Sequence, residues 1–100
     1  QPHRYSRTEL LLNDFEKAFL DADILIITDI YAAGESPIAG ISGETICKIV
    51  KNNNIKYIKN IEDILPELEK IKQDGDVIIT LGAGNIVKVS NDYAKKLSGS

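Results

Sequence analysis

The chain has 100 residues, of which 43% are apolar and 27% charged, and its formal net charge is −3. A chain of this length forms one domain, and its acidic balance argues against nucleic acid as a partner, because a phosphate-binding face needs excess basic side chains. No apolar run reaches the roughly 20 residues of a membrane span and no signal peptide is visible, so no membrane association is expected. The single cysteine, Cys47, favours a reduced, cytoplasmic setting.

Hydrophobic spacing predicts four helices that alternate with three strands. The helices are expected over about 6–21, 43–53, 60–71 and 85–97, and the strands over 24–31, 55–58 and 76–84. Ser6 and Glu9 fit a capping box at the start of the first helix, and Pro66 predicts that the third helix is kinked or begins late.

This alternation, with continuous apolar strands, predicts an α/β domain with a parallel sheet and right-handed crossovers. In such sheets ligands bind beyond the carboxyl ends of the strands, where two loops lie, residues 31–43 and 82–85. The opening residues QPHRYSR lead directly into a helix, as a strand-to-helix loop would. We therefore expect that one strand or more of the complete domain is missing ahead of them.

Arg4 and Arg7 lie at the predicted start of the first helix. A helix N-terminus carries about half a positive charge, and two guanidinium groups beside it would form a site for a carboxylate or a phosphate. The alternative is that both arginines are solvated surface residues. His3 is the only histidine and has no Cys or His partners for a metal site, which favours a structural role.

The stretch LGAGNI, residues 81–86, contains G-x-G but lacks the third glycine of the dinucleotide fingerprint, which argues against a nicotinamide site. Gly82 and Gly84 either let a ligand approach the backbone or only form a tight turn. Asp29 ends a strand, as a receiver-domain phosphoacceptor does. The other acidic residues and the lysine of such a site are missing, so Asp29 is expected to brace the loop that follows.

Three stretches, QPHRYSRT, DIYAAGESPIAG and LGAGNI, resemble in order and spacing the C-terminal domain of the Mur ligases, in the branch that adds L-alanine to UDP-N-acetylmuramate. The resemblance covers residues 1–100. It implies a three-layer Rossmann-like domain with a mainly parallel sheet, at least three strands and four helices, and without the first strand or strands. The chain would then be a partial domain of a longer ligase and inactive alone.

The resemblance also implies a reaction. ATP phosphorylates the lactyl carboxylate of the UDP-sugar, and the amine of L-alanine attacks the acyl phosphate. ATP and Mg²⁺ would bind mainly to a central domain that this chain lacks, while the two arginines would hold the alanine carboxylate. The substrate-binding residues so implied are His3, Arg4, Arg7, Tyr31, Gly84 and Asn85.

One alternative stays open, a freestanding flavodoxin-like module that binds a small anion or a protein partner. A P-loop upstream of Gln1 would favour the ligase. Residues 24–27 are apolar on both faces, which suits the middle of a sheet and not its edge. We therefore expect the chain either to self-associate through an exposed sheet edge or to be marginally stable.

Overall fold

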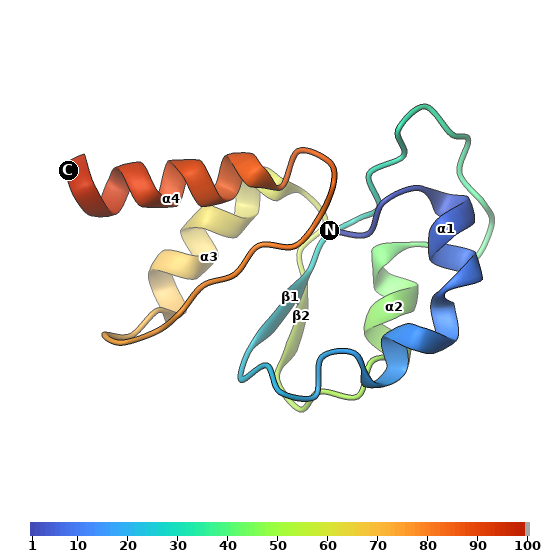
Figure 1. Ribbon diagram of the computed structural model, residues 1–100, viewed down its shortest axis with the longest axis horizontal. Coiled ribbons are helices and arrows are strands. Elements are labelled where there is room, and N and C mark those ends of the chain that lie inside the picture. The colour runs from blue at the N-terminus through green and yellow to red at the C-terminus, as the bar shows by residue number, and fades with distance from the viewer. Residues whose placement is uncertain (100) are drawn as a thin grey trace.

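The computed structural model describes residues 1–99 and has three layers (Figure 1). In chain order the elements are α1 (Tyr5–Leu10), the 3₁₀ helix η1 (Leu12–Lys17), β1 (Leu25–Ile27), α2 (Gly43–Ile49), β2 (Ile55–Tyr57), the 3₁₀ helix η2 (Ile61–Asp63), α3 (Ile64–Ile71) and α4 (Val87–Gly99). The two strands form the middle layer, with α1, η1 and α2 on one side and α3 and α4 on the other. The predicted α/β class is confirmed.

The two strands are parallel, with Leu25 opposite Ile55 and Ile27 opposite Tyr57. Successive side chains of a strand point to opposite faces, so Leu25 and Ile27 pack toward η1 and α2, whereas Ile26 packs toward α3 and α4. The sheet therefore divides the core into two clusters. Their buried residues are Ile27, Ile46 and Val50 on one side and Ile64, Leu68, Ile86 and Val89 on the other.

The prediction of at least three strands is wrong for the part of the chain that the structure describes, which has two. Residues 76–82 follow an extended course beside β1 without joining the sheet (Figure 1). Ile78 packs on the α3–α4 cluster, but the side chains of Val77, Ile79 and Leu81 are 84%, 73% and 60% exposed. A strand exists only where a neighbour accepts its hydrogen bonds, and here a groove separates this segment from β1.

The single helix predicted over 6–21 is interrupted. α1 ends at Leu10, and Leu11, at φ −98° and ψ 10°, leads into η1. Asn13 and Asp14 follow, and such side chains compete with the helix for backbone hydrogen bonds, which weakens an α-helix at this point. The face of η1 that carries Phe15 still packs on the sheet, as the hydrophobic spacing predicts.

The later helices agree better with the prediction. α3 begins late, after the 3₁₀ turn η2, and Pro66 lies in its first turn, where its missing N–H leaves no helical hydrogen bond unmade. α4 begins two residues after the predicted start. Within residues 1–99 no helix combines the length and the apolar character needed to cross a membrane.

Candidate functional site

Three segments meet at the carboxyl end of β1: residues 1–4, residues 29–31 and the turn 82–86. His3 forms a parallel bridge with Tyr31. The Tyr31 N–H donates to the Pro2 carbonyl at 2.9 Å, and the Arg4 N–H donates to the Tyr31 carbonyl at 2.8 Å. The N-terminal residues therefore run beside the chain that leaves β1, where the sequence predicts a loop of the site.

Gln1 joins this segment to the glycine-rich turn. Its side-chain Nε2 donates to Asn85 Oδ1 at 2.7 Å, and its Oε1 accepts from the Ile86 N–H at 3.1 Å. Its backbone nitrogen donates to the Leu81 carbonyl at 2.8 Å. Sequence reasoning missed Gln1 because a single amide residue at a chain start carries no pattern.

Gly84 lies against Tyr31. A Cβ atom placed on Gly84 would come within 2.5 Å of Tyr31 Cγ and 2.8 Å of Gln1 Oε1, so only glycine permits this approach. The His3 imidazole stacks on the Tyr31 ring, with centroids 5.8 Å apart and planes 9° apart. Four of the predicted residues, His3, Tyr31, Gly84 and Asn85, are thus brought together.

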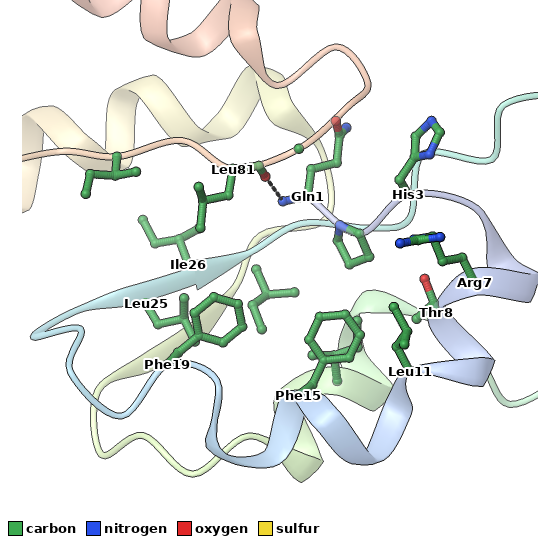
Figure 2. A pocket seen from close by; sticks show the side chains of 15 residues that line it. Gln1, His3, Arg7, Thr8, Leu11, Phe15, Phe19, Leu25, Ile26 and Leu81 are labelled. Carbon is green, nitrogen blue, oxygen red and sulfur yellow. Dashed lines mark hydrogen bonds between the residues drawn. The ribbon is translucent and has the colours of Figure 1, made fainter.

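The two predicted arginines flank this cluster and are exposed. Arg4 is the N-cap of α1 and has φ 64°, a left-handed conformation that is uncommon for a residue with a side chain. Arg7 extends from α1 toward the N-terminal segment that carries His3 (Figure 2). Within residues 1–99 neither guanidinium group joins an ion pair, so the N–H donors of both groups are available to bind a ligand.

The predicted capping box of Ser6 and Glu9 is wrong, because the start of α1 is capped by Glu35 instead. The carboxylate of Glu35 accepts from the Ser6 hydroxyl at 2.6 Å and from the Ser6 N–H at 3.1 Å. These bonds lower the pKa of Glu35 below its ordinary value of 4.5, and the charge of Arg4 adds to the effect. The start of α1 therefore already binds one carboxylate, which belongs to the loop after β1.

Lowering the pH is expected to release this loop from α1. Because the folded-state pKa of Glu35 is depressed, its bond to Ser6 is fully present above pH 4.5 and is lost as pH falls through the lower folded value. When the pH is lowered, the NMR shift of the Ser6 amide should change with a midpoint below pH 4.5, and the Glu35→Gln variant should show no such transition. A midpoint at or above 4.5 in the unaltered chain would contradict the bond.

Asp29 braces the same loop at both ends, as predicted from the sequence. Its Oδ1 accepts from the Ile30 N–H at 3.0 Å and from the Gly43 N–H at 3.4 Å. Gly43 lies so close to the residue that follows β1 that a Cβ atom there would meet the Thr28 carbonyl oxygen at 2.1 Å. The loop of residues 31–42 is therefore held at its base, while its middle is exposed.

The described residues offer no metal centre of their own: within 1–99 no three His, Cys, Asp or Glu side chains are grouped so that they could hold an ion. Cys47 is half-buried against the cluster of Ile27, Ile46 and Val50, and burial raises the pKa of its thiol. A raised pKa disfavours the nucleophilic thiolate, in agreement with the structural role that its apolar neighbours suggest.

Backbone turns, a stacked aromatic pair and two arginines thus lie together at the carboxyl end of a parallel strand, where α/β proteins commonly bind their ligands. No family model matches the chain. Curated relatives do. Over 99 residues it is 73% identical to the UDP-N-acetylmuramate–L-alanine ligase of Brachyspira hyodysenteriae. The matched region covers 97% of this chain and 21% of that protein.

Two further relatives with the same name come from Sulfurihydrogenibium sp. and Geotalea uraniireducens. Each is 49% identical, over 98% and 99% of this chain respectively and 22% of its own length. The chain is thus homologous, over practically its whole length, to a segment of the UDP-N-acetylmuramate–L-alanine ligases, and it spans about a fifth of the relatives it matches. The resemblance to Mur ligases seen in the sequence is confirmed.

Proposed function

We propose that this chain is the amino-acid-binding segment of an ATP-dependent ligase that joins L-alanine to UDP-N-acetylmuramate, a step of peptidoglycan precursor synthesis in the cytoplasm. The observation that carries the proposal is the homology to proteins of that name. The pair Arg4 and Arg7 beside the His3–Tyr31 stack supports it, because this is where an α/β domain binds ligands.

In this proposal the two guanidinium groups hold the carboxylate of L-alanine. Guanidinium forks match the planar geometry of a carboxylate and bind it through two parallel hydrogen bonds. The amine of alanine is then oriented toward the acyl phosphate that ATP forms on the lactyl carboxylate, and phosphate leaves as the amide forms. Such orientation lowers the barrier because the reacting groups no longer have to meet by diffusion.

The remaining predicted residues shape the pocket. The stacked rings of His3 and Tyr31 form a wall beside the arginines. Gly84 permits the turn of residues 82–86 to lie against that wall, and Asn85 is fixed by Gln1. The φ of 64° at Arg4 supports a functional role as well, since strained backbone clusters at binding sites.

ATP and Mg²⁺ belong to the proposed reaction but not to this chain. In this proposal both bind mainly to other parts of a longer ligase, as the resemblance to the Mur ligases implies. The proposed role of this chain is to bind and orient the amino acid and to close the active site over it.

A graft tests the proposal. The homologous segment of the Brachyspira ligase is replaced by residues 1–100, and phosphate release is measured with ATP, UDP-N-acetylmuramate and L-alanine. A second graft, of the Sulfurihydrogenibium segment, controls for the exchange itself. We expect alanine-dependent turnover within about tenfold of the control graft, because the proposed contacts to the amino acid are kept, and tenfold corresponds to a change of only about 1.4 kcal/mol in the activation free energy. A folded graft that releases no phosphate, beside an active control graft, would contradict the proposal and favour a freestanding binding module.

A further inference from the structure

The backbone of Arg4 has a conformation that its neighbours must hold in place. Its φ of 64° and ψ of 140° form a combination that residues with a Cβ atom rarely adopt. Such a conformation costs free energy and persists only where surrounding contacts fix it. The same two angles set the direction of the Arg4 side chain relative to His3 before it and to α1 after it. The contacts that fix this backbone therefore decide where the guanidinium group lies.

One set of contacts comes from within α1. The Thr8 hydroxyl donates to the Arg4 carbonyl at 2.7 Å, and the Thr8 N–H donates to the same oxygen at 3.1 Å. Thr8 is only 2% exposed, and Figure 2 shows its hydroxyl on the side of α1 toward the N-terminal segment. Because water does not compete for a buried hydroxyl, this bond holds the Arg4 carbonyl in one orientation.

The other set of contacts comes from the loop after β1. The Arg4 N–H donates to the Tyr31 carbonyl at 2.8 Å. Further along the same loop, Glu35 Oε1 accepts from the Ser6 N–H at 3.1 Å, and its Oε2 accepts from the Ser6 hydroxyl at 2.6 Å. The loop thus holds the chain at Arg4 itself and again two residues later.

A tight turn lets one loop hold both points. The Glu35 N–H donates to the Ala32 carbonyl at 3.0 Å, and Ala33 and Gly34 have φ of 52° and 88°. Positive φ at both central residues is typical of a type I′ turn, which reverses the chain within four residues. The Tyr31 carbonyl and the Glu35 carboxylate can therefore reach residues that are only two positions apart.

Ser6 also directs Glu35 away from the arginine. The bonds from Ser6 lower the pKa of Glu35, and the charge of Arg4 adds to this effect, so the two charged groups are near one another. Within residues 1–99 they nevertheless form no ion pair. A carboxylate that paired with Arg4 would compete with a carboxylate ligand, whereas both oxygens of Glu35 are bonded to Ser6.

We propose that Glu35 and Thr8 are positioning residues, which hold the backbone of Arg4 so that its guanidinium group binds the amino-acid carboxylate together with Arg7. This inference rests on the proposed function, because it takes the two arginines as the site of the alanine carboxylate. In it neither Glu35 nor Thr8 touches the amino acid. Their effect is to lower KM for L-alanine and not to raise kcat, since the bound carboxylate does not itself react.

The test measures alanine kinetics in the grafted ligase with Glu35→Ala and with Thr8→Val, which keeps the shape of Thr8 without its hydroxyl. We expect each variant to raise KM for L-alanine by about three- to tenfold and to leave kcat and KM for ATP within about twofold. Glu35→Gln keeps an acceptor for the Ser6 N–H and should recover most of the lost affinity.

Asn52→Ala is the matched control for lost stability. The Asn52 Nδ2 group donates to the carbonyls of Phe19 and Ala22 at 2.9 Å each, so this side chain also ties two segments through two hydrogen bonds. It lies before β2, at the end of the sheet opposite to the arginines. Asn52→Ala should lower Tm, as Glu35→Ala does, but leave KM for L-alanine unchanged.

Hydrogen exchange in the same grafted ligase, without alanine, is the second measurement. The amides of the peptide 3–8 should exchange about tenfold or more faster in Glu35→Ala and in Thr8→Val than in the unaltered graft, and at the unaltered rate in Asn52→Ala. If Glu35→Ala does not fold, Thr8→Val decides by the same two measurements.

An unchanged KM for L-alanine in Glu35→Ala and Thr8→Val would overturn the proposal. So would a raised KM without faster exchange of the peptide 3–8, because the effect would then not pass through the backbone of Arg4. An equal rise of KM in Asn52→Ala would reduce both residues to a general contribution to stability. Failure of the proposed function is a separate result, since it would appear as unaltered alanine kinetics in Arg4→Ala and Arg7→Ala.

Discussion

Replacing Arg7 by alanine in the grafted ligase is expected to lower kcat/KM for L-alanine by roughly ten- to a hundredfold. The guanidinium is proposed to donate charge-assisted hydrogen bonds to the alanine carboxylate, and losing such bonds costs about 1.5–3 kcal/mol. Arg4→Ala should act in the same direction. Steady-state kinetics with each substrate varied separately measure the effect.

The same experiment separates a binding role from a structural one. KM for ATP should change little in either variant, and Arg7→Lys should recover only part of the loss, because an ammonium group keeps the charge but not the fork. Lys48→Ala, which removes an exposed cation from α2, is the matched control and should leave the kinetics unchanged. Unaltered alanine kinetics in both arginine variants would refute the assignment.

Gly84→Ala is expected to have the second large effect. The new Cβ would meet Tyr31 Cγ at 2.5 Å and Gln1 Oε1 at 2.8 Å, which forces the turn of residues 82–86 away from the stacked rings. A displacement of about 1 Å in a positioned site can cost up to a hundredfold in rate. We expect kcat/KM for L-alanine to fall by roughly ten- to a hundredfold in the grafted ligase.

Gly75→Ala controls for lost stability. Gly75 has φ 90° in the turn after α3, where a Cβ has space but the backbone is strained, so the variant loses stability without touching the site. If Gly84→Ala and Gly75→Ala reduce alanine use equally, the contact between the glycine turn and Tyr31 has no particular part in the site.

The sequence predicts the arrangement of the site better than the details of its elements. Alternating apolar strands and amphipathic helices place the loops after parallel strands at one edge, and the contacts of His3, Tyr31 and Gly84 follow from that topology. Helix spacing likewise identifies the faces that pack on the sheet, because burial of an apolar stripe depends on local periodicity.

What the sequence does not predict depends on residues far apart in the chain. The cap of α1 comes from Glu35, 29 residues beyond Ser6, and no local motif indicates it. The apolar run of residues 76–84 is predicted as a strand because its composition is typical of one. Whether it pairs depends on a neighbouring strand, which local composition cannot predict. Self-association through an exposed sheet edge stays a prediction, and the open edge of β1 is where it would occur.

The contact between the substrate carboxylate and the arginines is the centre of this account. It is tested most directly by solid-state NMR on the grafted ligase, with L-alanine labelled with ¹³C at its carboxyl carbon and arginine labelled with ¹⁵N at its guanidinium nitrogens. The account predicts strong dipolar coupling between the two labels, reduced in Arg4→Ala and in Arg7→Ala. Bound alanine whose carboxyl carbon shows no coupling to arginine nitrogen, or the same coupling in both variants, would contradict it.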